Sequence, residues 1–303
     1  MTKEPAQINA YKFSKNGPAS LMPFALPAQR RGKHRIEIEI EPAGATLPIV
    51  SFRNAFFMGL KPSKLKLTEP TEIHKLRLSD PDDEMAGTLM STMPQELEQH
   101  ERQLKRAKGH VLIGGLGLGV AVGILARNPK VTDITVIEKS ADVIAMVEPF
   151  LPRLKNFHPV IVLQRDLFRH LKMVKKRGMK YDFAFYDIWS PTGQRIFSKF
   201  TMPLRKLSIG IVDQKNIECW NEDEIIGQSA LAINTRLQMP ATLKPILEAS
   251  WNEFEAMKAF NGEIWPFLKW LRTGRDKSPD QMNRAAEVYV KAMKDAEAYA
   301  KWE

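Results

Sequence analysis

The chain has 303 residues, of which 44% are hydrophobic and 26% are charged, proportions typical of a globular protein. Its only cysteine, Cys219, excludes a disulfide framework and a cysteine-ligated metal cluster, so we expect a reducing, cytoplasmic environment. Lysine and arginine outnumber aspartate and glutamate by 45 to 35, and the resulting net charge of +10 would attract an anionic partner such as nucleic acid.

Residues 1–33 contain prolines at intervals and no sustained hydrophobic period, which predicts an extended arm. Residues 1–20 also lack the continuous apolar core of a signal peptide. No stretch of the chain approaches the ~20 apolar residues that a membrane span requires. We therefore expect a soluble protein that does not associate with a membrane.

A small antiparallel β region is predicted for residues 34–93. Its first segment, HRIEIEIEP, alternates strictly and places Ile36, Ile38 and Ile40 on one face, with glutamates on the other. The segments ATLPIVSF, LKLTEP and EIHKLRLS predict further short strands that are separated by proline and glycine turns.

Strands and helices alternate in residues 94–220. Residues 94–109 predict a helix, with Pro94 in the first turn and Gly109 at the end. Four apolar strands follow, in the segments HVLIGG, DITVIE, VIVLQRD and YDFAFYD, with helices between them. This order predicts an α/β fold whose parallel sheet is covered on both faces. The segment SIGIVDQKNIECW fits either a further strand or a loop, and residues 221–303 predict a helical extension.

The stretch VLIGGLGLG places four glycines directly behind the first apolar strand. It does not satisfy the dinucleotide fingerprint G-x-G-x-x-G, because the third glycine would fall on Val120 or Val122. The pattern present is G-x-G-x-G, at Gly115, Gly117 and Gly119. Two interpretations are open at this point: close packing of a helix on the strand, or a ligand so near the backbone that no side chain fits.

An acidic residue closes each of the next three strands, namely Glu138, Asp166 and Asp187. Ligands bind at the carboxyl ends of the strands in open α/β sheets. Glu138 could accept hydrogen bonds from two ribose hydroxyls, and Asp166 could accept one from an adenine amine. The alternatives are a charge at a helix entry for Glu138 and a helix N-cap for Asp166.

Residues 109–193 resemble the cofactor-binding core of class I S-adenosylmethionine-dependent methyltransferases. The motifs that carry the resemblance are VLIGGLGLG, VTDITVIEKSADVI, VIVLQRDLF and YDFAFYDIWSP. Within that class they are similar to the spermidine-synthase-like branch, and to methyltransferase-like proteins encoded by bacteriophages. The resemblance implies a Rossmann-like sheet, S-adenosylmethionine as the cofactor, and methyl transfer to an amine or hydroxyl of a small-molecule or nucleic-acid acceptor. Whether the chain forms a homodimer is left open.

The same resemblance assigns roles to individual residues of the cofactor site. It implies that Gly115, Gly117 and Gly119 pass close to the methionine part of S-adenosylmethionine. Glu138 would hold the ribose, and Asp166 would meet the adenine amine.

Asp187 falls where the spermidine-synthase-like branch keeps a carboxylate that contacts the attacking amine, so it is the predicted catalytic residue. Trp189 and Ser190 are the predicted acceptor-binding residues, with a core position as the alternative for Trp189. An aminopropyltransferase would carry an acid within the glycine loop, where this chain has Leu116 and Leu118, and a second acid at the position of Ser190. That enzyme and an inactive, nucleic-acid-binding module are kept as the alternatives.

Other chemistries lack their motifs. The run after Asp187 is I-W-S-P and not the P-P-aromatic run of methyltransferases that act on base amines, and the six histidines show no metal-ligand spacing. In LFRHLKMVKKRG, basic residues gather on one side of a predicted helix. This arrangement is typical of a solvated helix face, with nucleic-acid contact as the alternative.

Overall fold

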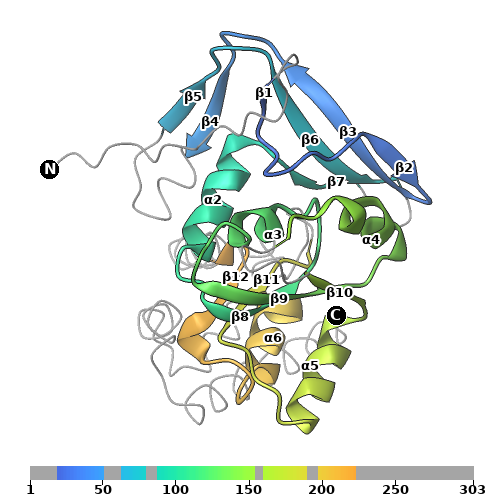
Figure 1. Cartoon of the computed structure of the whole chain (residues 1–303), viewed down its shortest axis with the longest axis vertical. Coiled ribbons are helices and arrows are strands. Elements are labelled where there is room, and N and C mark those ends of the chain that lie inside the picture. The colour runs from blue at the N-terminus through green and yellow to red at the C-terminus, as the bar shows by residue number, and fades with distance from the viewer. Residues whose placement is uncertain (1–18, 51–62, 80–86, 154–159, 190–196, 223–303) are drawn as a thin grey trace, which may run out of the picture.

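The computed structural model describes residues 19–50, 63–79, 87–153, 160–189 and 197–222 (Figure 1). The predicted helical extension after residue 222, the first 18 residues of the predicted arm and the predicted acceptor-binding residue Ser190 lie outside the described residues.

A five-stranded parallel sheet forms the centre of the described chain. In spatial order its strands are β10 (Ile161–Gln164), β9 (Val131–Glu138), β8 (Gly109–Gly114), β11 (Phe183–Tyr186) and β12 (Ile217–Cys219). From β8 the chain therefore adds β9 and β10 on one side and then crosses to the other side for β11 and β12, which is the doubly wound Rossmann arrangement. This confirms the predicted α/β fold. The segment left open between a strand and a loop contributes β12.

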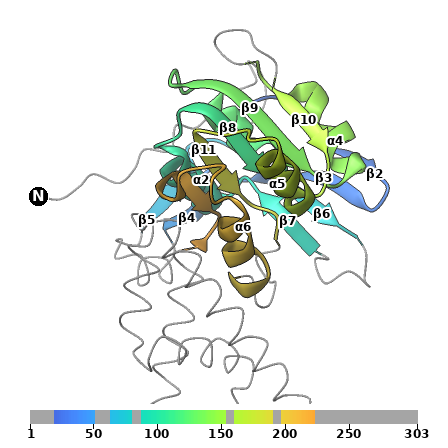
Figure 2. The same cartoon turned by 90° about the horizontal axis from the view of Figure 1, so that it is seen from below.

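Helices cover both faces of this sheet (Figures 1 and 2). On the face toward the N-terminal strands lie α2 (Pro94–Leu104), α3 (Val120–Leu125) and α4 (Ala141–Val147), and on the other face lie α5 (Leu167–Lys176) and α6 (Met202–Leu207). Single turns occur at η1 (Glu148–Phe150), η2 (Phe197–Thr201) and η3 (Gln214–Asn216). Because β8 is covered on both sides, Val111, Leu112 and Ile113 are fully buried, as their continuous apolar run predicts.

Helix α2 is shorter than predicted. It ends at Leu104 and not near Gly109, because the chain turns there to enter β8. The side chain of Ala107 is fully buried within that turn, and Gly109 adopts a positive φ of 63°.

The N-terminal β region contains a five-stranded sheet and a separate hairpin. The sheet consists of β1 (Ala19–Ser20), β2 (Gln29–Arg31), β3 (His34–Glu41), β6 (Thr71–Leu78) and β7 (Gly87–Ser91), and the hairpin of β4 (Thr46–Val50) and β5 (Ser63–Lys66). Strand β3 confirms the alternating segment, but its apolar face is buried only at Ile36, whereas Ile40 is 59% exposed. The reason is that the strand begins beside α4, where His34 meets Asp142, and then runs away from the α/β layers (Figure 1).

The described part of the predicted arm belongs to this β region. Strand β1 pairs in parallel with β6, and β2 pairs with β3. Leu21, Met22, Phe24 and Leu26 are buried, because these apolar residues fill the space between the N-terminal sheet and the helices beneath it. One continuous hydrophobic cluster therefore joins the β region to the α/β layers.

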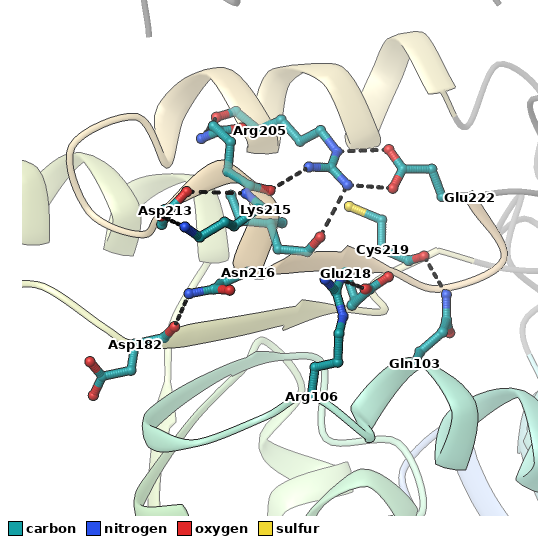
Figure 3. Close-up of polar contacts among 12 residues, drawn as sticks. Gln103, Arg106, Asp182, Arg205, Asp213, Lys215, Asn216, Glu218, Cys219 and Glu222 are labelled. Atoms are coloured by element: carbon teal, nitrogen blue, oxygen red, sulfur yellow. Dashed lines mark hydrogen bonds and ion pairs between the residues drawn. The ribbon is translucent and has the colours of Figure 1, made fainter. Parts of the chain in front are cut away.

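Polar contacts hold β12 and the chain that follows it (Figure 3). The Arg205 guanidinium of α6 donates to both carboxylate oxygens of Glu222 and to the backbone carbonyl of Ile217. From the opposite side, Gln103 of α2 donates to the carbonyl of Cys219 at 2.9 Å. The single cysteine is a buried residue of this edge strand.

Candidate functional site

A row of backbone hydrogen bonds joins the carboxyl ends of four neighbouring strands. The bonds run from Asp187 N to Gly114 O at 2.8 Å, from Gly115 N to Ile137 O at 2.9 Å, and from Arg165 N to Glu138 O at 2.8 Å. The glycine loop and the three strand-end acids that the sequence singled out therefore follow one edge of the sheet. The loop and Asp187 flank the point where the strand order reverses, which is where open α/β sheets bind ligands.

The three glycines of the G-x-G-x-G pattern all adopt positive φ angles: 93° at Gly115, 52° at Gly117 and 77° at Gly119. A Cβ atom at Gly117 would lie 2.6 Å from the sulfur of Met90, and one at Gly119 would lie 2.9 Å from the ring of Phe24. Backbone conformation and packing against protein atoms thus account for these glycines by themselves. Their contact with a cofactor stays a prediction.

Glu138 ties the glycine loop to the helix that follows β9. One carboxylate oxygen accepts a hydrogen bond from the N–H of Leu116 at 2.9 Å, and the other accepts one from the N–H of Ser140 at 2.7 Å. Each carboxylate oxygen has two lone pairs, so this half-buried group keeps capacity for two further donors such as the hydroxyls of a ribose. The helix-entry and ligand-binding interpretations of Glu138 are therefore compatible.

Asp166 is the N-cap of α5, as the alternative interpretation predicts. Its Oδ1 atom accepts a hydrogen bond from the N–H of Arg169 at 2.9 Å. The carboxylate is only partly buried. Because an N-cap uses one oxygen, the second can still accept a hydrogen bond from an amine.

Asp187 follows β11 and faces a buried histidine. Its Oδ2 atom lies 3.6 Å from Nε2 of His100 on α2, and the Asp187 side chain is 21% exposed while that of His100 is 2% exposed. The imidazole also packs edge-on against the ring of Phe185, with centroids 5.4 Å apart. Burial lowers the pKa of His100, but the Asp187 carboxylate and the carbonyl of Glu96 together outweigh it and place this pKa above the ordinary value of 6.5.

A second acid stands one helical turn before His100. The Glu96 carboxylate accepts hydrogen bonds from the N–H and the hydroxyl of Ser91, both at 2.5 Å. Burial raises the pKa of Glu96, and the bonds from Ser91 offset part of this rise. This anchors the start of α2 against the end of β7.

Trp189 is 3% exposed and packs near Phe200, with ring centroids 5.9 Å apart. The structure therefore favours the core alternative over the predicted wall for an acceptor, because the indole lies among apolar side chains.

Sequence reasoning missed His100, Glu96 and Met90 as neighbours of the site. A signal for His100 did exist: it lies three residues after Leu97 and four before Leu104, on the apolar face of the predicted helix. A polar residue at such a position needs a buried partner. The partner cannot be identified from sequence, because it comes from a strand 87 positions later.

Within the described part of the chain, no group of histidine, cysteine and acidic residues could hold a metal ion. None of the described helices is both long enough and apolar enough to cross a membrane.

No family model matches the chain, and no curated protein matches it. Solved structures do. MnmC2 from Aquifex aeolicus is 14% identical, with a TM-score of 0.35, and the match covers 73% of this chain and 82% of that one. A protein from Streptococcus mutans assigned as a SAM-dependent methyltransferase is 14% identical, with a TM-score of 0.33 and coverage of 63% and 49%. A SAM-dependent methyltransferase from Agrobacterium tumefaciens is 13% identical, with a TM-score of 0.31 and coverage of 59% and 53%. The chain thus spans about half the length of the last two.

Proposed function

We propose that this chain is an S-adenosylmethionine-dependent methyltransferase of the class I type. The observation that carries the proposal is the row of residues at the carboxyl edge of the sheet: the glycine loop, Glu138, Asp166 and Asp187 follow β8, β9, β10 and β11 respectively. The spermidine-synthase-like branch is the finer assignment that the sequence motifs support.

The residues at this edge fit the chemistry of that cofactor. Glu138 is aligned by two backbone N–H groups and keeps lone pairs for a ribose, and Asp166 keeps one oxygen for the adenine amine. The N–H of Leu118 faces only the sulfur of Met90, at 3.3 Å, which is a weak acceptor that a carboxylate could replace. When bound, S-adenosylmethionine supplies a methyl group on a positively charged sulfur, an activated leaving group.

Asp187 is the residue that we assign to the acceptor. Its carboxylate is partly exposed at the strand end nearest the glycine loop. A carboxylate there can orient an N–H or O–H group and accept its proton. The acceptor is a small molecule or a nucleic acid that presents an amine or a hydroxyl.

The test is calorimetric titration of the purified chain with S-adenosylmethionine. We expect micromolar binding, with loss of binding in Glu138→Ala. The matched control is Asp182→Ala, because Asp182 also accepts a hydrogen bond from a backbone N–H, that of His110 at 2.8 Å, but precedes β11 at the opposite edge of the sheet. No binding to the wild-type chain, or equal loss in both variants, would contradict the proposal.

Turnover tests the role of Asp187. With methyl-labelled S-adenosylmethionine and an acceptor found by screening amines and nucleic acids, Asp187→Asn should lower turnover by about 100-fold or more while cofactor affinity stays within about twofold. Transfer from decarboxylated S-adenosylmethionine in place of the methyl donor would indicate the aminopropyltransferase alternative.

Nucleic acid is a second candidate partner because of the outer face of α5. Arg169, Lys172, Lys175 and Lys176 are exposed there, and no described acid forms an ion pair with them. Such a face can contact phosphates without sequence preference.

A further inference from the structure

The imidazole of His100 is enclosed in the fold, with each ring nitrogen aimed at an oxygen. Its Nδ1 atom lies 2.8 Å from the backbone carbonyl oxygen of Glu96, and its Nε2 atom lies 3.6 Å from Oδ2 of Asp187. The residue is 1% exposed, so water cannot stand in for either partner. Nε2 has no hydrogen-bond partner at ordinary hydrogen-bond distance.

The two oxygens determine where the protons are. A backbone carbonyl only accepts, so Nδ1 carries a hydrogen and donates it to Glu96. A neutral ring with that tautomer would turn the lone pair of Nε2 toward the carboxylate, which is repulsive. One further proton must therefore lie between Nε2 and Oδ2, and a carboxylate with an imidazolium is the arrangement that both partners favour.

The charges around the ring agree with this protonation. Glu96, on the same helix, and Asp187, from the end of β11, are the acids that act on His100, and each favours its charged form. From β11 the uncharged ring of Phe185 also packs against the imidazole. Oε2 of Glu96 accepts both hydrogen bonds from Ser91, and the carboxylate oxygen that lies nearest Nε2 is Oδ2 of Asp187.

We propose that His100 is a positioning residue for Asp187. As an imidazolium fixed by the Glu96 carbonyl, it holds Oδ2 on the side away from the acceptor and so turns Oδ1 toward the acceptor. This inference rests on the proposed function. It assigns His100 no contact with S-adenosylmethionine or the acceptor. The orientation of the carboxylate is then set by α2 as well as by β11, since helix and strand each supply one member of the pair.

Nuclear magnetic resonance of histidine labelled with ¹³C and ¹⁵N tests the pair without any ligand. The His100 signals are assigned from the loss of one set in His100→Gln. In the wild-type chain we expect both ring nitrogens to stay protonated above pH 6.5, the ordinary midpoint. In Asp187→Asn the midpoint should fall by about one pH unit or more, because burial then acts without the opposing anion. Asp182→Asn, which removes an acid at the far edge of the sheet, should leave it unchanged.

A neutral His100 at pH 6 in the wild-type chain, or an equal midpoint in the wild-type chain and Asp187→Asn, would overturn the inference. These outcomes are independent of cofactor binding, whereas failure of S-adenosylmethionine to bind the wild-type chain would overturn the proposed function alone.

Turnover separates positioning from simple packing. The amide of His100→Gln can still donate to Asp187, but His100→Leu fills the space without a donor. We expect His100→Gln to retain most of the turnover and His100→Leu to lose about tenfold or more, with cofactor affinity unchanged within about twofold in both. Equal turnover in the two variants would show that His100 does not act through Asp187.

Discussion

Gly115 and Asp187 touch across the point where the strand order reverses. A Cβ atom at Gly115 would overlap the backbone carbonyl oxygen of Asp187, and the φ angle of Gly115 is 93°. The loop that is proposed to bind the cofactor and the residue that is proposed to face the acceptor are therefore fixed against each other by backbone atoms. A displacement of the backbone at either residue would therefore displace the other.

Gly115→Ala should destabilise the chain by about 2–4 kcal/mol, because it combines a disfavoured φ with a clash against backbone that cannot rotate away. The control is Gly178→Ala, at a glycine with a φ of 65° and open space around its Cβ position, which should cost only about 1 kcal/mol. Urea unfolding of the two variants measures the difference. Equal midpoints would show that the contact with Asp187 contributes nothing beyond backbone strain.

The elements that were predicted correctly are those whose signal is local. The apolar runs of β8 and β11 identify buried strands, and the N-cap interpretation of Asp166 needs only the N–H of Arg169, three positions later. Each of these depends on residues within a few positions along the chain, so the sequence contains the whole interaction.

The features that were missed depend on residues far apart in the sequence. The apolar residues Leu21, Met22 and Phe24 look like part of an arm because the helices that they cover begin about 100 positions later. Met90 meets the glycine loop only through tertiary packing. For the glycine pattern the sequence left packing and ligand binding open; protein atoms lie at each of these Cβ positions, and contact with a cofactor stays a prediction. Packing and ligand binding leave the same sequence pattern.

The Arg205–Glu222 pair offers a test of what holds the edge of the sheet (Figure 3). Both side chains are buried, at 7% and 6% exposed. Glu222→Ala would leave the guanidinium buried without its counter-charge, and we expect a loss of about 3–5 kcal/mol in the free energy of unfolding. The neighbouring pair of Lys215 and Asp213 is more than half exposed, so Lys215→Ala should cost less than about 1 kcal/mol. If Glu222→Ala lowered the free energy of unfolding by no more than Lys215→Ala does, water would have to reach the Arg205 guanidinium.

The basic face of α5 predicts binding to nucleic acid that weakens steeply with salt. Replacing Lys172 and Lys176 with glutamate should lower the affinity for duplex DNA or RNA and should reduce the slope of log affinity against log salt by about two. The matched control is Lys130→Glu, an exposed lysine before β9 at the opposite edge of the sheet from the candidate site. Fluorescence anisotropy with a labelled duplex measures both quantities. If the wild-type chain does not bind at low salt, this face is only solvated.

His170 makes stability depend on pH in a defined direction. It is 3% exposed on α5, with Nε2 3.3 Å from the hydroxyl of Tyr181. Burial, aided by the positive charge of Arg165, lowers the pKa of His170 from 6.5 to about 4. As the pH falls, His170 is protonated near pH 6.5 in the unfolded chain but only near pH 4 in the folded chain. The contribution of neutral His170 to the free energy of unfolding is therefore complete above pH 6.5 and is lost as the pH falls toward 4.

His170→Leu removes that linkage while keeping an apolar side chain in the same space. Between pH 7 and pH 4.5 the wild-type chain should lose about 1–2 kcal/mol more stability than the variant. Urea unfolding at the two pH values gives the difference, in which the other titrating groups cancel. A variant with the same pH dependence as the wild-type chain would show that His170 is protonated in the folded state well above pH 4.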